Sequence, residues 1–165
     1  MPQMPAPPPM KFVSRLERDQ LNAARDPKAR NRTSMGLAAD RLARAENFTA
    51  DKNFAHASEE LGGYLGLIDD AVGFLRSLPL DKSSTRDLYR HFDIALRAHI
   101  PRIAVMRRST PADYAANFKA AEEYARDTRA GVLEAFYGHT VLREDPGYQK
   151  NADKTKSPPE ENKRP

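Results

Sequence analysis

The chain of 165 residues contains no cysteine and no tryptophan. The lack of cysteine rules out disulfides and thiolate chemistry and leaves the redox compartment undetermined. No stretch of 18 apolar residues occurs, so we expect no transmembrane helix. Nine of the 13 prolines fall within residues 1–10 and 143–165. The sequence therefore predicts one domain over residues 11–142, between a proline-rich N-terminal segment and a charged tail that are both disordered.

Residues 1–10 have neither the basic start nor the apolar run of a signal peptide. Their proline-rich composition is nevertheless typical of the spacer that follows a cleaved signal. The localisation is unknown from the sequence. A cytoplasmic location and, if a signal peptide has been lost, an extracytoplasmic location both stay open.

Apolar residues recur through residues 54–78 at spacings that alternate between three and four. This spacing is typical of a helix that buries one continuous face against partner helices. The apolar positions are Phe54, Ala57, Leu61, Tyr64, Ile68, Ala71, Leu75 and Leu78. Similar stripes predict three more main helices and a short helix over residues 10–25. No segment alternates with period 2 for long enough to be a strand. We therefore expect an all-α fold, an antiparallel up-down bundle of four main helices plus a short N-terminal helix.

Capping residues and prolines predict where these helices begin and end. The expected boundary residues are Asp26 and Pro27 for the start of the second helix, Asp51 for the third, Ser83 or Ser84 for the fourth, Thr110 and Pro111 for the fifth, and Gly138 for its end. Pro101 lies inside the fourth helix and is expected to kink it, because proline cannot donate the helical hydrogen bond.

Basic and acidic segments alternate along the chain. Residues 11–50 and 81–110 each carry a net charge of +4, whereas residues 51–80 and 111–142 carry −3 and −2. If consecutive helices pack antiparallel, each basic helix lies beside an acidic one. We therefore expect most arginines to pair with carboxylates across helix contacts.

The helix pair on either side of residue 50 resembles a tetratricopeptide-type hairpin. The matching residues are Ala45 and Phe48 in the first helix and Asn53, Phe54, Ala57 and Leu61 at the start of the second. The resemblance covers roughly 30 residues and occurs once, whereas a solenoid needs several repeats. It implies protein or peptide binding rather than catalysis.

The glycines of residues 54–78 form a candidate partner-binding face together with an acidic pair. Gly62, Gly66 and Gly73 lie on the side opposite the apolar stripe, and Asp69 and Asp70 lie between them in sequence. A mid-helix glycine costs about 1 kcal/mol relative to alanine, so the cluster needs a reason. The alternatives are close approach of the short N-terminal helix, contact with a second subunit, and a plain solvent face.

Histidine offers one candidate polar site. His99 lies within the apolar stripe of the fourth helix, beside Pro101, and is either a buried hydrogen-bonded residue or a ligand-binding or proton-handling group. His56 with Glu59 or Glu60 has the spacing of half a metal site. The order is reversed and the motif is unpaired, so we expect no metal and no cofactor.

The sequence contains no phosphate-binding glycine loop and no nucleophile with an identifiable base, so we expect no enzyme activity. Two basic clusters suggest nucleic-acid binding as an alternative function. Their members are Arg25, Lys28, Arg30 and Arg32, and Arg102, Arg107 and Arg108. Acidic residues interrupt the first cluster, which makes nucleic acid a less favoured partner.

These patterns favour a non-catalytic interaction or structural module. We expect it to bind a protein partner or to self-associate, through a groove between the first two helices or through the glycine face. A basic nucleic-acid-binding protein is the main alternative, and a bundle that binds a metal or a small molecule is the weaker one.

Overall fold

The computed structural model describes residues 10–143, and these residues form five helices with no strand among them. The helices are α1 (Arg15–Ala23), α2 (Pro27–Ala50), α3 (Phe54–Ser77), α4 (Ser83–Arg108) and α5 (Ala112–Arg143). The predicted all-α helical bundle is confirmed. Residues 1–9 and 144–165, for which disorder was predicted, lie outside the described part of the chain.

The start of α2 agrees with the sequence prediction, whereas the starts of α1 and α3 differ from it. Asp26 caps α2 and Pro27 is its first residue, as predicted. The short N-terminal helix begins later than expected, because Ser14 and Glu17 form a reciprocal capping box that fixes its start. The prediction that Asp51 caps α3 is wrong: Asn53 accepts the hydrogen bond at that start, from the His56 backbone N–H.

The later boundaries also differ from the sequence prediction. Neither serine caps α4, because Lys82 occupies the cap position and makes no side-chain capping bond. The Thr110 hydroxyl donates to the Met106 carbonyl and so closes the end of α4 instead of opening α5. Gly138 lies inside α5, which continues to Arg143. α4 continues as one helix through Pro101.

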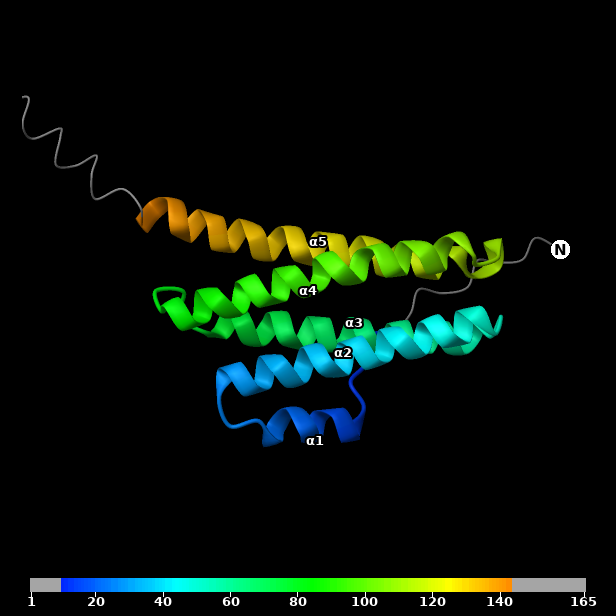
Figure 1. The fold of residues 1–165 in the computed structure, drawn as a ribbon, viewed down its shortest axis with the longest axis horizontal. Coiled ribbons are helices and arrows are strands. Elements are labelled where there is room, and N and C mark those ends of the chain that lie inside the picture. Colours follow the sequence, from blue (N-terminus) through cyan, green and yellow to red (C-terminus); the bar gives the residue numbers. More distant parts are fainter. Residues whose placement is uncertain (1–9, 144–165) are drawn as a thin grey trace, which may run out of the picture.

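The four long helices form two antiparallel hairpins, α2–α3 and α4–α5 (Figure 1). The hairpins lie side by side, so that α3 packs against α5 and α2 packs against α4, with α3 and α4 in little contact. α2 and α4 therefore run in the same direction. α1 packs along the outer side of the α2–α3 hairpin.

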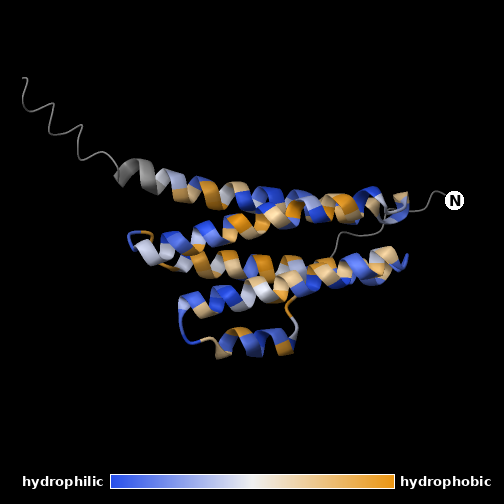
Figure 2. Ribbon diagram, in the orientation of Figure 1, coloured by the Kyte–Doolittle hydropathy of each residue, from blue (hydrophilic) through white to orange (hydrophobic). Residues whose placement is uncertain are grey.

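α3 is the central and most hydrophobic helix (Figure 2). The predicted apolar stripe is buried from Ala57 to Leu75, and every residue from Leu61 to Ile68 is buried as well. α3 is thus enclosed on more than its apolar stripe. That enclosure brings polar and glycine positions of α3 into contact with the rest of the chain.

Ion pairs cross the helix contacts as the alternating charges predict. Arg30 of α2 pairs with Asp70 of α3 at 3.1 Å, and Arg107 of α4 pairs with Glu122 of α5 at 3.1 Å. Arg129 of α5 also reaches back to a carboxylate of α4 at 2.6 Å. These three arginines therefore stabilise contacts between the helices of the bundle.

Candidate functional site

The glycine face of α3 is covered by the start of the chain. Residues 10–13 cross α3 in extended form, and the Phe12 N–H donates to the Gly62 carbonyl at 3.3 Å. A Cβ on Gly62 would overlap the Met10 carbonyl oxygen, and a Cβ on Gly66 would overlap the Phe12 carbonyl oxygen. These two positions require glycine because another backbone passes directly over them.

Gly62 and Gly66 are consequently not a free surface for a partner in this structure. Gly73 differs, since it is exposed and has open space around its Cβ position. The predicted partner-binding face therefore divides into an occupied part and one isolated glycine. Of the three alternatives, an intrachain approach accounts for Gly62 and Gly66. It is an extended segment, and not the N-terminal helix, that makes the contact.

The acidic pair next to the glycines is also used within the chain. Asp70 pairs with Arg18 of α1 at 2.5 Å as well as with Arg30. Asp69 accepts a hydrogen bond from the Tyr124 hydroxyl and lies 3.8 Å from the Lys11 ammonium. Burial and the neighbouring Asp69 carboxylate raise the pKa of Tyr124 to about 12. The two aspartates therefore hold the N-terminal arm (residues 10–23) and α5 against α3.

His99 is part of the core. Its Nδ1 atom lies 3.1 Å from the Tyr64 hydroxyl, and both side chains are buried. Burial and the positive charge of Arg102 lower the pKa of His99 to about 4, so the ring is neutral at pH 7. Burial also raises the pKa of the Tyr64 hydroxyl. The hydrogen-bonded buried histidine, one of the two predicted alternatives, describes this geometry.

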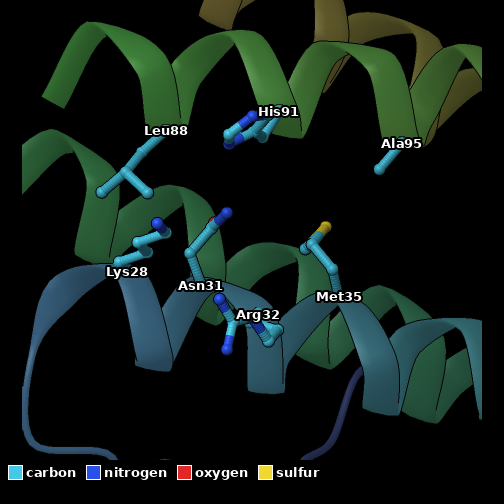
Figure 3. Close-up of a pocket in the computed structure, with 7 residues that line it drawn as sticks. All are labelled: Lys28, Asn31, Arg32, Met35, Leu88, His91 and Ala95. Atoms are coloured by element: carbon cyan, nitrogen blue, oxygen red, sulfur yellow. The ribbon is translucent and has the colours of Figure 1, made fainter. Parts of the chain in front are cut away.

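A groove runs between the N-terminal halves of α2 and α4, and sequence reasoning did not find it. Seven residues line its first compartment, which has a volume of about 270 Å³ (Figure 3). They are Lys28, Asn31, Arg32, Met35, Leu88, His91 and Ala95. A second compartment of about 550 Å³ shares Lys28, Leu88 and His91 and extends to the first residues of both helices. We call this continuous space the α2–α4 groove.

Positive charges outnumber negative charges in the α2–α4 groove. Lys28, Arg32 and Lys82 make no ion pair within residues 10–143. Of the two aspartates at its rim, Asp87 lies 3.8 Å from Arg90, and Asp26 caps α2 by accepting the Ala29 N–H at 2.7 Å without an ion pair of its own in this part of the chain. The N-termini of α2 and α4 add partial positive charge at the same end.

One signal for the groove is present in α2. The first two buried positions of α2, Asn31 and Ser34, are polar, the next three are Ala38, Leu42 and Ala45, and the last, Thr49, is polar but donates its hydroxyl to the Ala45 carbonyl. A polar residue at a core position of an amphipathic helix marks a place where the helix does not meet an apolar neighbour. The opposing residues come from α4, which lies some 60 positions away in sequence.

An apolar stripe lies on the outside of α4, the helix that also forms one wall of the groove. Its residues do not line the groove itself, and Ile94 lines a separate hollow of about 270 Å³ against α5. Ile94 is 55% exposed and Val105 is 57% exposed, and Ala98 and Pro101 lie between them at spacings of four, three and four. That spacing places all four on one side of the helix. Val105 also lines a hollow of about 630 Å³ between the C-terminal ends of α2 and α4. We call these four residues the α4 stripe.

The basic clusters that suggested nucleic-acid binding are partly used by the fold. Arg30, Arg102 and Arg107 pair with Asp70, Glu46 and Glu122. The other four members, Arg25, Lys28, Arg32 and Arg108, make no ion pair within residues 10–143, and two of these, Lys28 and Arg32, line the α2–α4 groove.

Within residues 10–143, no three His, Asp or Glu side chains gather closely enough to hold a metal ion. His56 instead lies with its Nδ1 atom 2.8 Å from Asn53. No helix in this part of the chain has an apolar stretch long enough to cross a membrane. Comparison with models of protein families, with curated proteins and with solved structures finds no match to this chain.

Proposed function

We propose that the protein is a non-catalytic interaction module that binds an acidic amphipathic helix of a protein partner across the α2–α4 groove and the α4 stripe. The observation that carries this proposal is the exposed α4 stripe on a helix that also forms one wall of a groove in which positive charges outnumber negative ones. Ile94 and Val105 each leave more than half of their surface in water, on the helix that also forms one wall of the groove.

The α4 stripe has the spacing of a helix-binding surface. Its residues repeat at four, three and four positions, which is the pattern by which an amphipathic helix engages a second helix. The separation of Ile94 and Val105 corresponds to about 16 Å along α4. A partner helix of about four turns covers the stripe and reaches the groove beside it.

Charge favours a heterologous partner over a second copy. α4 contains six arginines and two aspartates, so two copies facing each other through α4 bring like charges together. A partner helix with glutamates beside its apolar residues places opposite charges there instead. The resemblance of the α2–α3 hairpin to a tetratricopeptide-type hairpin also implies peptide binding.

A designed peptide provides the test. The probe is a fluorescent helical peptide of about 15 residues, with leucines at alternating spacings of three and four and glutamates beside them. A second peptide has lysines in place of the glutamates. We expect the glutamate peptide to bind and the lysine peptide not to bind, as measured by fluorescence anisotropy. Ile94→Asp and Val105→Asp should each weaken binding at least about tenfold, which corresponds to roughly 1.4 kcal/mol.

Leu16 supplies a matched control. It is 69% exposed on α1, outside the proposed surface, so Leu16→Asp should leave peptide binding unchanged. Equal binding of both peptides, or loss of binding in the Leu16 variant, contradicts the proposal. A concentration-dependent dimer that Ile94→Asp dissolves, seen by light scattering, identifies a second copy as the partner. Salt-sensitive DNA binding that ignores Ile94→Asp favours the nucleic-acid alternative.

A further inference from the structure

The Asn31 side chain lies at the floor of the α2–α4 groove, and no other side chain among residues 10–143 accounts for its polar amide. The residue is only 6% exposed, and its amide makes no hydrogen bond with any other residue of the described chain. In Figure 3 the side chain points from α2 toward α4, into the space between Lys28 and His91. Neither polar atom of the amide is both fully buried and without a hydrogen bond, so the amide opens to solvent through the groove. Its donors are available to a group that enters the groove.

Cationic and donor groups surround this amide. Lys28 lies one turn before Asn31 on the same side of α2, and Arg32 follows it. His91 approaches from α4 on the opposite wall (Figure 3). None of these three side chains makes an ion pair within residues 10–143. Met35 and Leu88 add apolar surface to the lining, while Lys28, Arg32 and His91 are themselves exposed.

We infer that this compartment binds one oxyanion, the carboxylate or phosphate of an acidic side chain on the partner helix. The inference rests on the proposed function and names the group that the surface recognises. Arginine and lysine provide charge-assisted hydrogen bonds to such a group. The Asn31 amide provides a neutral donor beneath them. The compartment volume of about 270 Å³ accommodates a side chain but not a second helix.

The first experiment uses the full chain and small anions. Sodium acetate and sodium phosphate are titrated at constant ionic strength against sodium chloride, and the side-chain amide signals of Asn31 and the Tm are recorded. We expect acetate, phosphate or both to shift the Asn31 signals and to raise the Tm by a few degrees, because a ligand that binds only the folded state stabilises it. Chloride should do neither. No response beyond that of chloride overturns the inference.

Two variants and a control make the result specific. Asn31→Leu and Lys28→Gln should remove the anion-dependent rise in Tm. Arg15→Gln, which removes an exposed charge on α1, should keep it. Asn31→Leu should leave the Tm in the absence of the anion almost unchanged, because the Asn31 amide makes no hydrogen bond within residues 10–143. A lower Tm for this variant means that Asn31 holds the fold together, which overturns the inference.

The peptide probe separates this inference from the proposed function and identifies the source of the anion. Peptides with one glutamate, one phosphoserine or one glutamine facing the compartment are compared on the wild type and on Asn31→Leu. The inference is supported if the glutamine peptide binds the wild type more weakly than the other two peptides do and this difference disappears in Asn31→Leu. Whichever of the glutamate and phosphoserine peptides binds the wild type more tightly then identifies the anion as carboxylate or phosphate. If all three peptides bind both proteins equally, the oxyanion site is wrong while the proposed function stands.

Discussion

The charged groups on the two sides of the α2–α3 hairpin are arranged differently. On the arm side, Arg41 lies 2.6 Å from Glu17 and 3.0 Å from Glu60, and each of these carboxylates is nearly buried. On the groove side, Lys28 and Arg32 have no carboxylate partner among residues 10–143. Charges that are buried and paired complete a fold, whereas charges left unpaired beside an apolar space are available to a ligand. The comparison therefore supports the groove, rather than the glycine face, as the proposed interaction surface.

The largest effect tests the arm side. Gly66→Leu places a side chain where the Phe12 backbone passes and should displace residues 10–13. We expect a loss of about 3 kcal/mol in the free energy of unfolding, the upper end for overpacking. Urea denaturation measures it. Gly73→Ala is the control, because nothing lies within 4 Å of its Cβ position, and it should stabilise α3 by up to about 1 kcal/mol. Equal stability of wild type and Gly66→Leu contradicts the close approach.

The second effect tests the paired charges of the arm. Arg41→Gln leaves Glu17 and Glu60 close together without their shared cation. Breaking such a nearly buried network should cost about 2 to 3 kcal/mol. Burial opposes ionisation of Glu17, but hydrogen bonds from Arg41 and Ser14 outweigh it and lower its pKa. This stabilisation is present above pH 4.5 and is lost as the pH falls through the lower folded-state pKa. In Arg41→Gln that acid-dependent loss should shrink.

A third effect concerns the core between the two sides. The pKa of His99 is near 4 in the folded state against 6.5 when exposed, so the unfolded state binds the proton first. Stability should therefore fall by roughly 1 to 2 kcal/mol between pH 6.5 and pH 4. In His99→Phe this part of the pH profile should be flat, as measured by urea denaturation at each pH. A profile identical to that of the wild type contradicts a buried neutral histidine.

The smallest effect is expected on the groove side. Arg32→Gln removes a charge that no residue of the described chain pairs with, so stability should change by less than about 0.5 kcal/mol. The contrast with Arg41→Gln is the most direct check of the comparison. If Arg32→Gln destabilises the protein as much as Arg41→Gln does, the groove is a structural contact and not a free surface.

Much of the fold follows from local sequence patterns. The apolar spacing of residues 54–78 identified the core helix, and Asp26-Pro27 located the start of α2. These patterns predict helices because helical periodicity and capping depend only on residues that are close together in the sequence. The cap of α3 was missed because Asp51 and Asn53 are equally suitable by type. Only the path of the chain decides that Asn53 lies at the first turn.

The candidate site could not be predicted in the same way. The α2–α4 groove brings Asn31 together with His91, and that meeting depends on α2 packing beside α4 and not on either helix alone. The occupant of the glycine face was equally hidden, because an extended segment without periodicity covers it. What the sequence does show is that α2 carries a polar residue at a core position. That observation becomes meaningful once the opposing helix is known.

The side-by-side arrangement of the two hairpins has a kinetic consequence. Each hairpin closes through contacts that are near in sequence, whereas α2 and α4 meet only when the hairpins dock. Local contacts form early in folding and distant ones form late. A ligand in the α2–α4 groove therefore stabilises an interface that is absent from the early folding species. Such a ligand lengthens the lifetime of the native state by slowing unfolding and leaves the folding rate almost unchanged.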